Sequence, residues 1–218
     1  MKIISFSLWG NNPKYSIGAI KNAELTSAIY PNWISRFYIH KDVDQKYIDQ
    51  IRKLNTQVLI MEENADWKAM MWRYLPAKDQ DVELFISRDC DSRINNREKA
   101  AVDQWLNSDK NFHIMRDHPY HGFSILGGMF GAKKNGFEIL NNLIVGFDFQ
   151  NSYGTDYNFF NTSLYPKIKQ DSVVHDDFFD KKPFPTMRLN NQFVGEIFDE
   201  NDNSDHVGKQ ALIEYLNK

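Results

Sequence analysis

Two aspartates separated by one residue, Asp89 and Asp91, follow directly on the largely apolar run 82–87. Side chains two residues apart on an extended segment point the same way, so the two carboxylates should converge. Carboxylate oxygens are suitable ligands for Mg²⁺ or Mn²⁺, which also bind phosphate oxygens and water. Cys90 should point the opposite way, into apolar packing. Because a solvated turn after a strand would have the same residues, the pair alone does not decide between a metal site and a turn.

The segments that must position this pair alternate predicted strands with predicted helices. Strands are expected at 3–8, 34–40, 58–61 and 82–87, and helices at 16–29, 45–54 and 68–74, with a break at Pro76. This alternation is typical of a parallel α/β sheet, which binds ligands at the carboxyl ends of its strands. Beyond residue 110 we expect mixed strands and loops, followed by a last helix at 209–216.

Composition limits the classes of protein to consider. The chain has 218 residues, 42% of them hydrophobic, which is enough for one substantial core. A single domain over 1–218 is therefore expected, either as a whole protein or as a domain excised from a longer one. A net charge of −3 argues against a nucleic-acid-binding protein. The single cysteine favours a reducing compartment. No apolar stretch reaches the length of about 20 residues that a membrane-spanning helix needs, so we expect a soluble, cytoplasmic protein without direct membrane insertion.

Several segments around the aspartates form an ordered series, namely 73–77 (RYLPA), 85–93 (FISRDCDSR), 115–119 (MRDHP) and 127–131 (GGMFG). Over about residues 1 to 200, this series resembles the GT-A-fold glycosyltransferases with a DxD motif, in particular the N-terminal glycosyltransferase domains of multidomain chlorella virus enzymes. The resemblance implies a Rossmann-like αβα sandwich with a mostly parallel sheet, a nucleotide-binding half at 1–110 and a more irregular acceptor-binding half at 111–218. A viral protein would act in the host-cell cytoplasm.

The resemblance also implies a divalent cation, Mn²⁺ or Mg²⁺, and a nucleoside-diphosphate sugar as donor, with a UDP-sugar favoured. Carried onto this sequence, the metal ligands are Asp89, Asp91 and His175. An ordinary loop histidine is the alternative for His175.

A second group of positions would bind the nucleotide and sugar of the donor: Ser7, Leu8, Trp9, Tyr15, Asp66, Arg73, Arg88, Gly127 and Gly128. Each has a structural alternative. Trp9 could pack in the core, Asp66 could cap a helix, and either arginine could pair with the aspartates and orient them. The two glycines could form a tight turn.

A carboxylate is also needed to take the proton of the acceptor hydroxyl if the reaction inverts the sugar. Asp156 is the first candidate for this base because a glycine turn presents it between aromatic residues, where burial would raise its pKa. Asp117 is the second candidate, or a contact to the donor sugar. Asp156 as a helix cap and Asp117 as a turn residue before a proline are the structural alternatives.

We therefore expect a metal-dependent enzyme that moves a hexose or deoxyhexose from a nucleoside-diphosphate sugar to an oligosaccharide or glycoprotein glycan. A retaining transferase and a nucleotide-sugar-binding module without activity remain alternatives. An aspartyl phosphatase would carry its aspartate pair after the first strand. A sugar-nucleotide pyrophosphorylase would need a glycine-rich, lysine-containing loop that residues 10–14 do not convincingly supply.

Overall fold

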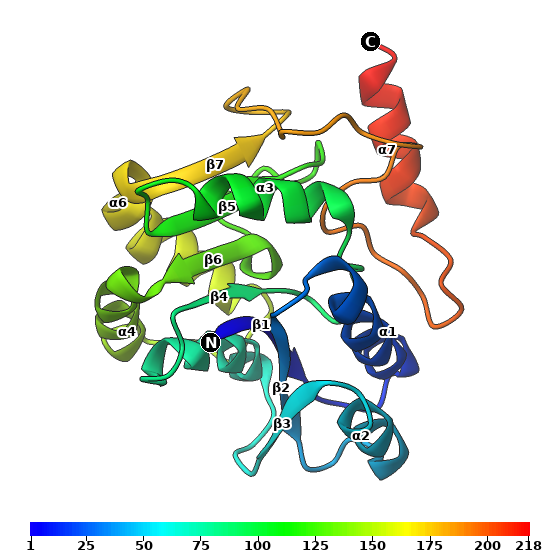
Figure 1. Ribbon diagram of the computed structural model, residues 1–218, viewed down its shortest axis with the longest axis vertical. Helices are drawn as coiled ribbons and strands as arrows, with labels where there is room; N and C mark the ends of the chain where they lie inside the picture. Colours follow the sequence, from blue (N-terminus) through cyan, green and yellow to red (C-terminus); the bar gives the residue numbers. More distant parts are fainter.

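A seven-stranded sheet forms the centre of the computed structural model, which describes residues 1–218. Its strands are β1 (Lys2–Leu8), β2 (Ile34–His40), β3 (Thr56–Met61), β4 (Leu84–Ser87), β5 (Phe112–Arg116), β6 (Phe130–Lys133) and β7 (Ser172–Asp176). They lie in the order β3-β2-β1-β4-β6-β5-β7 (Figure 1). Strand β6 runs antiparallel to both β4 and β5, and the other neighbouring pairs are parallel. The predicted α/β class with a mostly parallel sheet is confirmed.

Helices cover both faces of the sheet because side chains along each strand alternate between two apolar cores. Ile4 of β1 belongs to one core and Ile3 to the other. The first core includes residues of α1 (Pro13–Ile29), α2 (Gln45–Arg52) and α3 (Asn96–Leu106). The second includes residues of η1 (Trp67–Lys78), α4 (Phe137–Val145), η4 (Phe159–Leu164) and α6 (Tyr165–Ile168). Figure 1 shows α1 and α2 on one side of the strands and α4 and α6 on the other.

Several predicted boundaries differ from those observed. Helix α1 begins at Pro13 rather than at residue 16, because the side chain of Asn12 caps it by accepting a hydrogen bond from Lys14 N. The predicted break at Pro76 is wrong, since η1 continues to Lys78. This element is a 3₁₀ helix, in which a buried proline removes one hydrogen bond of the i→i+3 type without ending the chain of turns.

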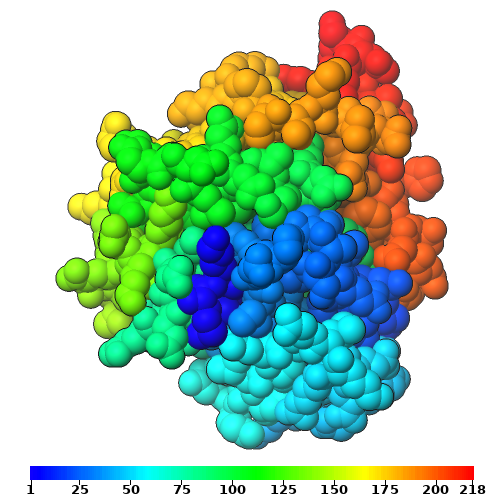
Figure 2. Space-filling view, viewed as in Figure 1, coloured from blue at the N-terminus to red at the C-terminus, as the bar shows by residue number.

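The second half of the chain extends the same sheet rather than forming a separate one. Strands β3, β2, β1 and β4, which precede residue 110, form one side of the sheet, and β6, β5 and β7 continue it on the other side, with β6 next to β4. The remaining elements are η2 (Gly127–Met129), η3 (Lys134–Gly136), α5 (Thr155–Asn158), η5 (Lys169–Asp171) and α7 (His206–Leu216). Helix α7, in red, projects at one edge of the surface (Figure 2). None of the helices combines the length and the apolar character needed to cross a bilayer.

Candidate active site

The aspartate pair lies in a turn immediately after β4, at the carboxyl end of the parallel part of the sheet. The side chain of Asp89 is 51% exposed and that of Asp91 is 13% exposed. Cys90 packs in the core between them, with its sulfur 3.4 Å from the carbonyl oxygen of Ser7. The predicted opposite direction of Cys90 is therefore confirmed.

Helix α1 holds this turn in place through Asn22. The Nδ2 group of Asn22 donates to the carbonyl oxygens of Cys90 (3.3 Å) and Ser92 (2.8 Å), and its Oδ1 accepts from Ile94 N (3.1 Å). The helix can come this close because residue 18 is a glycine, where a Cβ would lie 2.0 Å from the oxygen of Cys90. Sequence reasoning missed Asn22, although an amide on the apolar side of a helix is a usable signal.

Two cationic side chains pair with the aspartates. The guanidinium of Arg73, on η1, binds Asp89 and also donates to Asp156 Oδ2 (3.0 Å) and to the hydroxyl of Tyr74 (3.0 Å). Lys14 Nζ, in the first turn of α1, lies 2.8 Å from Asp91 Oδ2. Because all three guanidinium nitrogens of Arg73 have protein partners, the structure supports the alternative in which Arg73 orients carboxylates. Lys14 was not among the predicted site residues.

The two glycines of η2 close this group of residues from the other side. A Cβ on Gly128 would lie 1.9 Å from Asp89 Oδ2, and a Cβ on Gly127 would lie 2.7 Å from Asp156 Oδ2. The carbonyl of Gly127 accepts hydrogen bonds from Ser87 Oγ (2.7 Å) and from a tyrosine hydroxyl (2.9 Å). A larger residue at either position would have to displace the side chains that it meets. Gly128 therefore lies against Asp89, and Gly127 lies against Asp156.

Burial and mutual repulsion set the electrostatics of the carboxylates. Burial raises the pKa of Asp91, the negative charge of Asp89 raises it further, and Lys14 opposes both. Burial also raises the pKa of Asp156, against the opposing charge of Arg73. Two neighbouring carboxylates that disfavour each other's charge suit an added cation. No group of three or more His, Cys, Asp or Glu side chains is arranged to hold a metal ion, so the pair would have to share a cation with substrate oxygens.

His175 does not join the aspartates, which corrects its expected role as a third ligand. It lies on β7 with 2% of its surface exposed. Its Nδ1 is 2.8 Å from Nε2 of His113, and its Nε2 is 2.8 Å from Oε1 of Gln104 on α3. Both ring nitrogens therefore form hydrogen bonds to other side chains and are not free to bind a metal. Burial lowers the pKa of His175 to about 4.

Arg88 also differs from its expected role, because strand alternation directs it away from Asp89. Its guanidinium is 1% exposed, and its Nε donates to Glu98 Oε1 (3.0 Å), which also accepts from the hydroxyl of Tyr30 (2.8 Å). Arg88 forms a buried ion pair and does not reach the surface where a diphosphate would bind.

Asp117 is likewise fully engaged by the protein. Its Oδ2 accepts from Arg97 Nε (2.8 Å) and Val194 N (2.9 Å), and its Oδ1 accepts from a nitrogen of Arg188 (2.6 Å). The carboxylate is completely buried. It anchors the segment around residues 188–194 to the end of β5, so a role as general base is not supported.

The residues expected to bind the nucleoside lie along the carboxyl end of β1 and beside it. Ser7 Oγ accepts from Arg73 N (2.9 Å), and Leu8 is 1% exposed and packs in the core. Trp9 packs partly against the small cluster of Tyr38, Ala69 and Trp72. Tyr15, 38% exposed, is the one of these rings on the open side next to Asp91.

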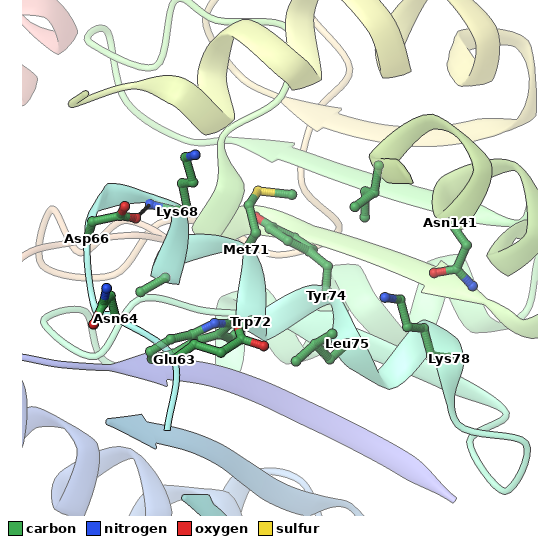
Figure 3. Close-up of a pocket in the computed structure, with 12 residues that line it drawn as sticks. Glu63, Asn64, Asp66, Lys68, Met71, Trp72, Tyr74, Leu75, Lys78 and Asn141 are labelled. Atoms are coloured by element: carbon green, nitrogen blue, oxygen red, sulfur yellow. Dashed lines mark hydrogen bonds between the residues drawn. The ribbon is translucent and has the colours of Figure 1, made fainter. Parts of the chain in front are cut away.

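A cavity of about 240 Å³ lies next to η1, beside the carboxylates rather than at them. Asp66, the only predicted site residue that lines it, also caps η1 by accepting from Lys68 N (2.7 Å). Figure 3 shows Asp66 and Asn64 at one end of this cavity, and Lys78 and Asn141 at the other. Its mixed polar and aromatic lining is compatible with a nucleoside, but it is separate from the aspartate pair.

No protein-family model matches this sequence, and no curated protein matches it. Among solved structures, the chain is similar to the 4-diphosphocytidyl-2C-methyl-D-erythritol synthase of Anaerococcus prevotii, with a TM-score of 0.53, 10% identity, and coverage of 100% of this chain and 97% of that one. It is also similar to residues 1–349 of Staphylococcus aureus TarS, with a TM-score of 0.52, 17% identity, and coverage of 81% of this chain and 58% of that one. A glycosyltransferase involved in glycosylation of the major capsid of PBCV-1 matches with a TM-score of 0.47, 16% identity, and coverage of 79% and 82%. At these identities the similarity shows a GT-A-like fold alone.

Proposed function

We propose that this protein is a glycosyltransferase that moves a hexose or deoxyhexose from a nucleoside-diphosphate sugar, most suitably a UDP-sugar, to an oligosaccharide or glycoprotein glycan. The observation that carries the proposal is the contact of Asp89 with both Arg73 and Gly128, and of Arg73 with Asp156. Asp89 and the buried carboxylate of Asp156 are thereby joined through Arg73 at the carboxyl end of the sheet, which supports a site for an anionic donor. The reducing environment favoured by the single, buried cysteine suits the cytoplasm.

Asp89 and Asp91 are the residues that would hold Mn²⁺ or Mg²⁺. Their oxygens are hard ligands, and two carboxylates plus substrate oxygens are a usual set for these ions. A bound cation would supply charge stabilisation for the departing diphosphate. Lys14 lies against Asp91 at the N-terminus of the 17-residue helix α1, where backbone N–H groups and the helix dipole favour anions. We assign Lys14 to the diphosphate of the donor.

Asp156 is our candidate for the general base of an inverting reaction. Its pairing with Arg73 favours the ionised form, while burial makes the carboxylate more basic than in water. Because Asp156 is 1% exposed, an acceptor must displace its covering groups before a hydroxyl proton can pass to it. The product anomer, determined by NMR, would distinguish inversion from retention.

Nucleotidyl transfer is the second candidate. One similar structure is named for the synthesis of a diphosphocytidyl compound, and the lysine beside Asp91 would suit a triphosphate as well as a diphosphate. The two reactions release different products. We expect UDP release when the protein is incubated with Mn²⁺, a UDP-sugar panel and glycan acceptors, and no pyrophosphate release from UTP or CTP with sugar phosphates. The reverse result would favour nucleotidyl transfer, and binding without turnover in either assay would favour an inactive nucleotide-sugar-binding module.

A further inference from the structure

Four aromatic side chains form a continuous aromatic strip, consisting of Phe123, Tyr157, Tyr153 and Trp67. Phe123 and Tyr157 stack with ring centroids 5.0 Å apart and an interplanar angle of 12°. Tyr157 meets Tyr153 edge-on at 6.2 Å, and Tyr153 meets Trp67 edge-on at 5.3 Å. These distances are typical of attractive aromatic pairs. The strip therefore combines three segments that are far apart in the sequence into one surface.

The strip stays open to solvent although its rings are large. Tyr153 is 73% exposed, Phe123 is 47% exposed and Trp67 is 41% exposed. Single exposed apolar side chains are common in proteins, but a contiguous exposed group next to a functional site indicates ligand binding. Tyr157, in the middle of the strip, is half-buried and has Phe123 stacked on one of its faces.

Hydrogen bonds from two asparagines hold the three segments of the strip in register. Asn151 Oδ1 accepts from Trp67 N (3.2 Å), which ties the start of η1 to the segment before α5. Asn161 Oδ1 accepts from Ser124 N (2.7 Å), and its Nδ2 donates to Tyr157 O (2.7 Å). The aromatic rings are thus presented by a fixed backbone arrangement, which reduces the ordering cost of binding a ligand.

The strip is continuous with the proposed active site. Tyr157 follows Asp156, and the backbone N of Tyr157 donates to Asp156 Oδ1 (3.0 Å). Asp156 in turn contacts Arg73, the partner of Asp89. A ligand lying on the strip would therefore have one end near the carboxylate that we assign as base.

We propose that the aromatic strip is the acceptor subsite, and that it binds a neutral saccharide by stacking pyranose rings on Tyr153, Tyr157 and Trp67. This inference rests on the proposed function. Hexopyranose rings have apolar C–H faces that pack on aromatic rings, while their hydroxyls stay in water or hydrogen bond to tyrosine and indole edges. None of the four strip side chains carries a charge, so the surface selects a neutral sugar over a phosphorylated or acidic one.

Saturation-transfer NMR tests this subsite directly. With Mg²⁺ and UDP bound, irradiation of the aromatic protons of the protein should transfer saturation to maltotriose or cellotriose, and more weakly to glucose 6-phosphate. Trp67→Ala with Tyr153→Ala should weaken trisaccharide binding about tenfold or more. Tyr47→Ala, on helix α2, is the matched control and should leave the signal unchanged. The single variant Tyr153→Ala, which removes a ring that is 73% exposed, keeps the test valid if the double variant folds poorly.

The outcomes separate this inference from the proposed function. UDP binding without saturation transfer to either trisaccharide would overturn the acceptor subsite and leave the donor site standing. Equal signals in wild type and Tyr153→Ala, or a preference for glucose 6-phosphate, would also overturn it. Strip-dependent trisaccharide binding without any UDP binding would support the saccharide surface and count against the proposed transferase.

Discussion

Arg73 is the residue through which the two acidic parts of the candidate site are connected. It is 5% exposed, with Asp89 and Asp156 on two of its nitrogens and Tyr74 on the third. A buried guanidinium with three partners is a fixed element, and removing either carboxylate would leave part of its charge unpaired. This connection makes Asp156 sensitive to changes at Asp89, and it favours single, isosteric substitutions as probes of the site.

Asp156→Asn tests the base assignment. The amide keeps the size of the side chain but cannot take a proton, so kcat should fall by about 10²–10⁴-fold while UDP binding is kept. The acid limb of the wild-type kcat/KM profile should lie above the ordinary aspartate range of about 4, because burial raises the pKa of Asp156. A variant with kcat within about tenfold of wild type would make Asp156 a positioning residue for Arg73.

Lys14→Met tests the assignment of Lys14 to the diphosphate. Loss of the ammonium group should weaken UDP binding about tenfold, from the loss of one charge-assisted contact, while uridine binding stays unchanged. Isothermal titration with both ligands gives the comparison. Lys46→Met, on helix α2, is the matched control. An equal loss for UDP and uridine would show that Lys14 acts on the structure of the site rather than on phosphate.

At the scale of single residues, the direction of a side chain could be predicted from the sequence where the local backbone geometry determines it. The inward direction of Cys90 follows from a buried strand that runs into a turn. The contact of Asp89 with Gly128, which lies on a separate segment, was not predicted. The roles of Arg88 and His175 could not be predicted, because their partners Glu98 and Gln104 lie on helix α3, whose packing depends on the whole sheet.

Among the elements, η2 places a glycine directly against the carboxylate of Asp89. Gly128→Ala would put a methyl group 1.9 Å from Asp89 Oδ2, so either the turn or the carboxylate must move. We expect metal-dependent UDP binding to weaken by at least about tenfold, with the fold retained by circular dichroism. Gly146→Ala is the matched control because its nearest neighbour would lie 3.5 Å away, an ordinary contact. Unchanged UDP affinity in Gly128→Ala would argue against a role in the donor site for the close contact between Gly128 and Asp89.

Long periodic elements were predictable and short ones were not. Strand β2 was predicted with its observed limits, since its pattern is apolar and its ends are marked by turn residues. Strand β6 has four residues and includes a glycine and a lysine, so nothing local in the sequence distinguishes it from a loop. Pairing with β4 and β5 makes it a strand, and that pairing depends on tertiary structure.

For the whole molecule, the buried histidines predict a loss of stability in acid. Burial lowers the pKa of His175 to about 4 and that of His121 to about 3, so the unfolded chain binds protons more readily than the folded one below pH 6.5. The stability that the folded state has because both imidazoles stay neutral is fully present above pH 6.5 and is lost as the pH falls towards 4. Between pH 7 and pH 5, the free energy of unfolding should drop by about 2 kcal/mol for each histidine.

Chemical denaturation of wild type and His175→Gln at several pH values measures this effect. The variant should lose stability less steeply with falling pH, whatever its stability at pH 7. His206→Gln, on the exposed start of α7, should keep the wild-type slope. If His175→Gln also keeps the wild-type slope, His175 does not contribute to acid destabilisation.

The central claim is that Asp89 and Asp91 bind the diphosphate of a nucleotide donor through a divalent cation, and UDP binding with and without Mn²⁺ tests it most directly. Isothermal titration should show binding by wild type that depends on Mn²⁺ and disappears with EDTA. Asp89→Asn with Asp91→Asn should remove this dependence while uridine still binds weakly. Unaltered Mn²⁺-dependent UDP affinity in the double variant would contradict the account.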